Sequence, residues 1–399
     1  MDSCSLIMSI RSLKASQRIN QVQEPIIPII SDLIKKYPNT ISLGQGVAYY
    51  GPPKSVYKKI KEFGSSIDCH TYSEVEGTEE LRKEVIKKLK SENKTTINKK
   101  REVIISAGSN MAFMNAIIAI AEPNDEIILL RPYYFNHEMA INMINCKAII
   151  IDTDINYQPC LEKISSAITS RTKAIVTVSP NNPSGAVYPK STLIEINKIC
   201  KDNSIYHISD EAYEYFTYDE IEHFSPCSID NSEEYTIALY SLSKAYGFAS
   251  WRIGYMVIPE HLSLPIKKIQ DTYLICPTRI SQEAAIEALK TGRSFTKKHI
   301  KQIIDSRKNL LFGLQQIKDI CISPITMGAF YFFVKLRTNL TGLELVEILI
   351  KDYKIAAIPG EPFGMEKDCY LRVSYGALNT GVSEIGTQRL IKGLRETIG

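Results

Sequence analysis

The chain has 399 residues, of which 44% are hydrophobic and 23% are charged, an ordinary composition for a globular protein. This length favours one large and one smaller domain. The formal charge of +4, from 48 basic and 44 acidic residues, is too small to indicate nucleic-acid binding. No apolar run reaches the roughly 18 residues that a membrane-spanning helix needs, so we expect no membrane association.

The N-terminal segment and the cysteines bear on location. The first 18 residues include one acidic residue, Asp2, and no sustained apolar run before a cleavage site. This argues against a secretory signal and leaves a short transit peptide open. The nine cysteines are scattered, odd in number and free of any C-x-x-C pair, which indicates reduced thiols. We therefore expect a cytoplasmic protein.

The elements that follow alternate between helices and strands. Pro25 and Pro28 predict an extended N-terminal arm, and an apolar face that includes Leu81 and Leu89 predicts a helix over residues 78–89. Seven β-prone runs then alternate with helical patterns, which predicts a mainly parallel seven-stranded sheet sandwiched by helices. The seven runs are 103–106, 126–130, 146–152, 173–178, 204–209, 236–240 and 255–258.

The C-terminal part predicts a second, smaller unit. A long charged helical pattern begins after residue 294 and leads to strand-like runs at 328–336 and 370–374. We therefore expect a large domain over residues 60–293, a C-terminal small domain over residues 294–399, and an N-terminal arm that contributes to the small domain over residues 1–59.

Five polar or aromatic clusters each follow one of the predicted strands directly. In open parallel sheets, ligands bind at the edge formed by the carboxyl ends of the strands. The sequence therefore predicts an active site at this edge. The clusters are Gly108-Ser109-Asn110, Tyr133-Tyr134, Asn181-Asn182-Pro183, Asp210-Glu211-Ala212-Tyr213 and Ser243-Lys244.

Several common kinds of site are disfavoured. The sequence contains no G-x-S-x-G nucleophile elbow and no evident Ser-His-Asp arrangement. It also lacks a G-x-G-x-x-G fingerprint and a P-loop lysine. Its six histidines have no spacing typical of metal ligands, so we expect no metal.

Lys244 has the most informative surroundings. An ammonium at the end of a buried strand is costly unless it is solvated, paired or used covalently. Ser241 and Ser243 precede it by three and one residues, and Arg252 follows by eight. An isolated lysine here is most simply a surface residue, but these hydroxyls and this guanidinium suit a dianionic phosphate beside an amine that forms an imine.

This segment resembles the S-x-S-K signature of the class I/II aminotransferases, with its arginine eight residues later. The run Asn182-Pro183-Ser184-Gly185 is similar to the N-P-[ST]-G motif of the same family. The resemblance implies the fold of aspartate aminotransferase-like enzymes, namely the PLP-dependent transferase fold type I with a smaller α+β domain, and the cofactor pyridoxal 5'-phosphate (PLP). It also implies that Lys244 is the Schiff-base lysine and the proton shuttle.

The resemblance assigns roles to three residues around the pyridine ring. Asp210 would keep the ring nitrogen protonated, although an aspartate after a strand can also cap a helix. Tyr213 and Asn182 would donate hydrogen bonds to the phenolic oxygen of the cofactor. Tyr134 would stack on the ring, with Tyr133 and Phe135 as neighbouring alternatives for that position.

Further positions concern the phosphate and the assembly. Gly108, Ser109 and Asn110 open a predicted helix, whose N-terminal amides suit a phosphate, although Gly-Ser turns are common. Tyr72 matches the family position that reaches the phosphate from the neighbouring subunit. The resemblance thus implies a homodimer with shared active sites.

Three residues are candidates for binding the substrate: Gly46, Arg372 and Asn182, which would also contact the cofactor. Arg372 lies in a strand-like run and would bind the α-carboxylate with its planar fork, with a structural salt bridge as the alternative. Gly46 would make a backbone contact. The run Gly46-Val47-Ala48-Tyr49-Tyr50 departs from the family's G-x-P-x-F. Its two tyrosines favour an aromatic or methionine-like substrate, whereas Arg279 is a weak candidate for binding a distal carboxylate.

The implied activity is transamination in amino-acid metabolism. An L-amino acid would give its amino group to a 2-oxo acid through a ping-pong cycle between PLP and pyridoxamine phosphate. A PLP-dependent lyase or cyclase on the same scaffold remains the alternative, because elimination and cyclisation begin with the same deprotonation at Cα.

Overall fold

The structure, a computed structural model, describes Leu13 and residues 15–399. Most of the segment that raises the question of organelle targeting therefore lies outside the described residues, as does Cys4. Across the part of the chain that is described, no helix combines the length and apolar character needed to cross a membrane.

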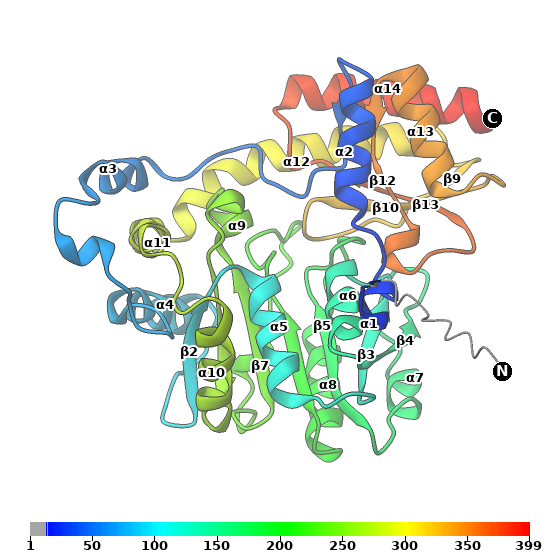
Figure 1. Ribbon diagram of the computed structural model, residues 1–399. Helices are drawn as coiled ribbons and strands as arrows, with labels where there is room; N and C mark the ends of the chain where they lie inside the picture. The colour runs from blue at the N-terminus through cyan, green and yellow to red at the C-terminus, as the bar shows by residue number, and fades with distance from the viewer. Residues whose placement is uncertain (1–12, 14) are drawn as a thin grey trace, which may run out of the picture.

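A seven-stranded sheet forms the centre of the larger part of the molecule (Figure 1). Its strands lie in the order β2-β8-β7-β6-β5-β3-β4, and only β8 runs antiparallel to its neighbours. The predicted mainly parallel sheet is confirmed, with one strand from each predicted run. The strands are β2 (Arg101–Ser106), β3 (Glu126–Arg131), β4 (Lys147–Asp152), β5 (Thr172–Val178), β6 (Tyr206–Asp210), β7 (Thr236–Ser241) and β8 (Gly254–Pro259).

Helices cover both faces of this sheet, because successive strand residues point to opposite sides. Ile127 and Leu129 of β3 share one buried cluster with α5 (Ser109–Ile120), α6 (Phe135–Met143) and α10 (Ser263–Tyr273). Ile128 and Leu130 belong to the other cluster. That second cluster includes α4 (Glu79–Glu92), α7 (Leu161–Ser166) and α8 (Lys190–Asp202), while α11 (Arg279–Thr291) packs on α3 (Lys54–Glu62) and α4.

The N-terminal segment differs from the prediction. The expected extended arm is wrong, because α2 (Ile26–Lys36) begins directly after Pro25. Pro28 lies in the first turn of this helix, where an N–H group has no partner within the helix and its loss is tolerated. The buried side chains of Ile26 and Ile30 dock the helix. The predicted helix over 78–89 is present as α4, with the Thr78 hydroxyl capping its start.

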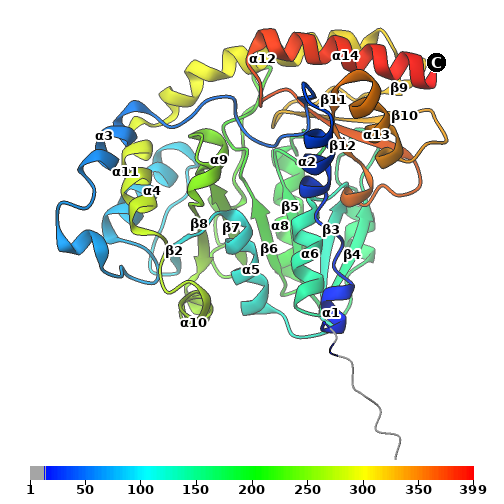
Figure 2. The same ribbon diagram turned by 45° about the horizontal axis from the view of Figure 1, so that its top comes forward.

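The smaller part of the molecule is built around a four-stranded antiparallel sheet, β12-β13-β10-β9. These strands are β9 (Cys321–Ile322), β10 (Tyr331–Leu336), β12 (Ile358–Pro359) and β13 (Cys369–Ser374). The helices α12 (Arg293–Gln315), α13 (Gly342–Tyr353) and α14 (Thr380–Ile398) lie around it, close to α2 (Figure 2). The domain limits at residues 59 and 293 stay a prediction.

Pairing of two short strands joins the N-terminal segment to this smaller part of the molecule. Strand β1 (Ile41–Ser42) runs parallel to β11 (Ile355–Ala356). The residues that follow β1 therefore lie beside the small sheet and not beside β2. This connection positions the loop around Gly46 opposite the carboxyl edge of the large sheet.

Candidate active site

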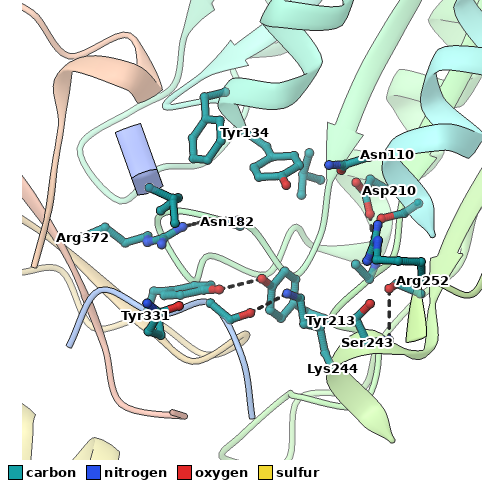
Figure 3. A pocket seen from close by; sticks show the side chains of 18 residues that line it. Asn110, Tyr134, Asn182, Asp210, Tyr213, Ser243, Lys244, Arg252, Tyr331 and Arg372 are labelled. Carbon is teal, nitrogen blue, oxygen red and sulfur yellow. Dashed lines mark hydrogen bonds between the residues drawn. The ribbon is translucent and has the colours of Figure 1, made fainter. Parts of the chain in front are cut away.

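A cavity lies at the carboxyl edge of the large sheet, and side chains from β10 and β13 close its other side (Figure 3). The segments after β2, β3, β5, β6 and β7 meet here because these strands run in one direction. All predicted site residues except Gly108 and Tyr72 line the cavity. They are Gly46, Ser109, Asn110, Tyr134, Asn182, Asp210, Tyr213, Ser241, Ser243, Lys244, Arg252 and Arg372.

Lys244 projects into this cavity from the short helix α9 (Leu242–Ala245), which directly follows β7. The Ser241 hydroxyl accepts a hydrogen bond of 3.2 Å from the Ser243 N–H and so caps the start of the helix. The Lys244 Nζ donates to the carbonyl oxygen of Gly46. It also lies 5.7 Å from the centre of the Tyr213 ring.

The surroundings of the amine favour its neutral form. Burial lowers the pKa of Lys244 to about 8, helped by the positive charges of Arg372 and Arg252 and opposed by Asp210. An ordinary lysine has a pKa near 10.4 and is almost wholly charged at pH 8. A large fraction of the Lys244 amine is therefore neutral near pH 8, which makes it a competent nucleophile and base.

One end of the cavity is suited to an anion. Gly108 precedes α5 with a φ of 85°, and no side chain caps the helix, so the first-turn amides remain available. A Cβ on Gly108 would lie 2.4 Å from Arg252 Nη2, so only glycine lets the guanidinium approach the helix start. Ser241 and Ser243 line the cavity together with Arg252. These positive and donor groups match a phosphate.

Asp210 provides a buried negative charge elsewhere in the cavity wall. This residue ends β6 and is 3% exposed. One of its oxygens, Oδ1, accepts a hydrogen bond of 3.1 Å from the Ala212 N–H. Residues 211–216 form turns and not a helix, so the helix-capping alternative is wrong. A buried carboxylate that faces a cavity is suited to a cationic ligand group.

His137 is a neighbour of Asp210 that the sequence reasoning missed. Its Nε2 lies 3.1 Å from Asp210 Oδ2, although the angle between the two groups does not meet that of a hydrogen bond. The imidazole stacks on Phe113 with ring centres 4.0 Å apart and is 1% exposed. Its position one helical turn after Tyr134 was the available signal, because residues three apart share a helix face.

Tyr213 and Tyr331 form a pair of buried phenols. Their hydroxyl oxygens are 2.7 Å apart, and both side chains line the cavity. Burial is the largest cause that raises the pKa of each phenol, so both remain protonated at neutral pH. Tyr331 was not among the predicted site residues, although it lies in the predicted strand over 328–336.

Arg372 is buried and fixed by two hydrogen bonds on one side of its guanidinium group. Its Nη1 donates to Asn182 Oδ1 and its Nη2 donates to the Gly44 carbonyl, both at 2.8 Å. No described carboxylate pairs with it within 4.0 Å, which argues against the structural salt bridge. The adjacent Asn181 instead shapes its own loop, because its side-chain oxygen accepts from the N–H and hydroxyl of Ser184.

The aromatic residues after β3 have separate environments. Tyr134 and Phe135 both line the cavity, and the Tyr134 hydroxyl accepts a hydrogen bond of 2.8 Å from Asn136 Nδ2. Tyr133 does not line the cavity. Its ring instead lies against Gly364, where an added Cβ would come within 2.6 Å of Tyr133 Cε1.

Other residues considered for the site lie away from the cavity. Tyr72 is 78% exposed, and Arg279 pairs with Glu283 at 3.1 Å on its own helix. Tyr49 and Tyr50 do not line the cavity in this chain and pack against His299 instead. The Tyr50 hydroxyl also donates to the carbonyl of Ala245 at 3.1 Å, next to Lys244. The argument that these two tyrosines favour an aromatic substrate stays a prediction.

Comparison with known proteins identifies the family. The sequence profile of aminotransferase class I and II matches residues 38–390. The chain belongs to the class I and II aminotransferases. An aromatic aminotransferase from Arabidopsis thaliana is 32% identical, covering 96% of this chain and 97% of the relative. An aspartate aminotransferase from Pyrococcus abyssi is 29% identical, with coverage of 96% and 98%.

Solved structures of this aminotransferase family share the whole fold. An aspartate aminotransferase from Thermus thermophilus superposes with a TM-score of 0.86 at 26% identity and covers 96% of this chain and 100% of its own. The predicted fold type I is confirmed, and the protein is a PLP-dependent aminotransferase that transfers an amino group from an amino acid to a 2-oxo acid. Nothing in the comparisons favours the lyase or cyclase alternative.

Proposed function

We propose that this aminotransferase holds its cofactor and substrate through the cavity residues predicted above, with Lys244 as the covalent attachment point. One arrangement carries the proposal: a buried amine lies in a cavity that also contains an anion site and a separate buried carboxylate. The space that Gly108 leaves for Arg252 supports a bound phosphate. The buried carboxylate of Asp210 suits a protonated pyridine nitrogen.

The remaining cofactor contacts follow from the side-chain groups whose hydrogen-bond donors are not used within the protein. Asn182 uses its side-chain oxygen to accept from Arg372, which leaves its NH₂ group as a donor for the phenolic oxygen of PLP. The Tyr213 hydroxyl is the second donor, and the centre of its ring lies 5.7 Å from the Lys244 amine. Tyr134 offers an aromatic face, and Ser109, Asn110, Ser241 and Ser243 bind the phosphate with Arg252.

When bound, PLP supplies an electron sink that stabilises negative charge at Cα of the amino acid. Lys244 then has a second task, because its displaced Nζ is free to take a proton from Cα and return it elsewhere. A pKa of about 8 suits this task, since a base works best when its pKa is near the operating pH. The Gly46 carbonyl oxygen orients the amine by accepting its hydrogen bond.

Arg372 binds the α-carboxylate of both substrates in this proposal. Its hydrogen bonds to Asn182 and Gly44 hold the guanidinium plane, and its Nε has no protein partner in the described residues. A carboxylate can accept from two N–H groups of a guanidinium at once. Gly46, which also lines the cavity, makes the backbone contact to the substrate in this proposal.

We further propose an apolar or aromatic amino acid as the amino donor. Ile27, Phe135 and Val178 line the cavity, whereas the cations among its described lining residues, Lys244, Arg252 and Arg372, already have roles. The Arabidopsis relative is named an aromatic aminotransferase. Turnover with phenylalanine and with aspartate tests this choice, and faster turnover with aspartate would contradict it.

A homodimer is the proposed active assembly, with Tyr72 reaching the phosphate of the partner's site. Its exposure of 78% supports this role, because an aromatic ring gains from burial against another surface. Ile67 nearby in sequence is also 76% exposed. We also propose a cytoplasmic location, which suits the free thiols of the described cysteines.

Visible absorbance tests the role of Lys244. The purified enzyme with PLP should show a pH-dependent visible band that disappears on adding phenylalanine, with stoichiometric pyridoxamine phosphate as the product. The Lys244→Ala variant should lack the covalent linkage and lose at least 10⁴-fold in rate, about 5 kcal/mol of activation free energy. An unchanged band in the variant would overturn the proposal. Lys351→Ala, at an exposed lysine, is the control.

A further inference from the structure

Tyr331 joins the two functional halves of the cavity. It is the first residue of β10, and its side chain is fully buried in the protein while lining the cavity. Its hydroxyl lies 2.7 Å from that of Tyr213. Its ring lies beneath the Arg372 guanidinium, with the ring centre 4.5 Å from Cζ. Figure 3 shows Tyr331 between these two side chains.

Gly46 brings the main chain close to the same hydroxyl. A Cβ on Gly46 would lie 2.7 Å from the Tyr331 oxygen, so the phenol occupies space that a side chain would fill. The Gly46 carbonyl in turn accepts from Lys244. Tyr331 therefore contacts or adjoins each group that the proposed function uses to orient the amine, the phenolic oxygen and the carboxylate.

The hydrogen-bonding capacity of the two phenols fixes the direction of their bond. Each hydroxyl has one proton to donate and can also accept. If Tyr213 donates to the cofactor, it has no proton left for Tyr331, so Tyr331 must be the donor between them. Tyr213 is the sole hydrogen-bond partner of the Tyr331 hydroxyl among the described residues. The proton of Tyr331 thus has a single protein acceptor.

We propose that Tyr331 is a positioning residue that donates to Tyr213, directs the Tyr213 proton toward the cofactor and supports Arg372 from below. This inference rests on the proposed function of Tyr213 and Arg372 and adds a residue that acts through both. The hydroxyl orients the Tyr213 proton, and the ring supports Arg372. The two tasks can therefore be separated by substitution.

Removing the hydroxyl alone should change the spectrum and leave substrate binding intact. In Tyr331→Phe, Tyr213 becomes a weaker donor, so the cofactor's phenolic oxygen retains more negative charge and favours the protonated lysine linkage. The pH midpoint of the visible band should rise by about half a unit to one unit, as expected for the loss of one hydrogen bond. The shift should be smaller than in Tyr213→Phe. The KM for the amino acid should change less than twofold.

Removing the ring should affect substrate binding as well. Tyr331→Leu loses the cation–π contact with Arg372. This attraction stabilises the position of the guanidinium more strongly when it is shielded from water. The KM for the amino acid should rise about tenfold, with a midpoint shift like that of Tyr331→Phe. The double variant Tyr213→Phe/Tyr331→Phe should shift the midpoint no further than Tyr213→Phe alone, because both changes act on one chain of hydrogen bonds.

Tyr157→Phe is the matched control. Tyr157 is buried, and its hydroxyl donates at 2.8 Å to the carbonyl of Phe333, which lies on β10 as Tyr331 does. Tyr157 does not line the active-site cavity. Its midpoint and KM should match the wild type. An unchanged midpoint in both Tyr331 variants would overturn the inference while leaving the roles of Tyr213 and Lys244 standing. If Tyr213→Phe also leaves the midpoint unchanged, the proposed function of Tyr213 fails first.

Discussion

The two walls of the cavity are built in different ways. The large-sheet wall consists mainly of residues at or just after the carboxyl ends of parallel strands, including Asn110, Asp210 and Lys244. The small-sheet wall consists of Ile27, Gly46, Tyr331 and Arg372, which come from segments far apart in the chain. The first wall is fixed by the direction of the strands. The second depends on how the N-terminal segment and the small sheet pack together.

This difference suggests a division of work. The large-sheet wall contains the residues proposed to hold the cofactor, and the small-sheet wall contains those proposed to select and orient the substrate. Changes in the first wall should alter cofactor binding or its chemistry. Changes in the second should alter KM for the amino acid while leaving the cofactor bound, except loss of the Tyr331 hydroxyl alone, which acts on the cofactor through Tyr213.

After Lys244, the largest effect is expected at Asp210 in the large-sheet wall. Asp210→Asn should lower kcat about 10³-fold, equivalent to about 4 kcal/mol, because a neutral amide no longer holds a proton on the pyridine nitrogen. The measurement is the single-turnover rate with phenylalanine at saturating PLP. A rate within tenfold of the wild type would show that the carboxylate is not used in this way.

A smaller effect is expected at Arg372 in the small-sheet wall. Arg372→Lys keeps the charge but loses the planar fork, so kcat/KM should fall about 100-fold, or about 3 kcal/mol. The affinity for PLP, measured by equilibrium dialysis, should stay within twofold. A large loss of PLP affinity would contradict the division between the walls.

Gly108 tests the anion site with a single methyl group. Gly108→Ala should weaken PLP binding about tenfold, because the new Cβ meets Arg252 and because a φ of 85° strains any L side chain. Gly381→Ala is the matched control, since a Cβ there meets nothing within 4 Å. Equal PLP affinities in the two variants would argue against a phosphate at the start of α5.

The last prediction concerns the stability of the cofactor-free protein and not its activity. Folding lowers the Lys244 pKa from 10.5 to about 8, so below pH 8 the folded state bears the full cost of the buried charge. As the pH rises from 8 to 10.5, the unfolded chain retains a proton that the folded chain has lost, and the free energy of unfolding rises. Lys244→Met should be more stable than the wild type by about 3 kcal/mol at pH 7.

Urea unfolding at pH 7 and pH 10 measures this difference. The advantage of Lys244→Met should shrink at pH 10, because most of the cost has gone from the wild type by then. A constant difference across this range would mean that the pKa of Lys244 is not depressed in the folded protein.

The sequence predicted the large-sheet wall well for a physical reason. Strands such as β6 and β7 appear as apolar runs, and parallel strands place the residues that follow them at one edge. The positions of Asp210 and Lys244 in the cavity follow directly. His137 was missed because it lies inside a helix, where only its spacing from Tyr134 separates it from an ordinary core histidine.

The small-sheet wall was predicted less completely. Arg372 was identified because a charged residue inside an apolar strand requires a partner. Tyr331 was missed because a tyrosine in an apolar strand gives no such signal, and Ile27 because Pro25 and Pro28 favoured an extended arm in place of α2. The contacts of Tyr49 and Tyr50 with His299 depend on the packing of α12, which no local pattern specifies.

Borohydride reduction followed by peptide mass mapping tests the central claim most directly. Reduction of the PLP-bound enzyme fixes the cofactor to whichever lysine carries it. The account predicts one pyridoxyl group per chain, on the peptide that contains Lys244. Attachment to any other lysine would contradict it.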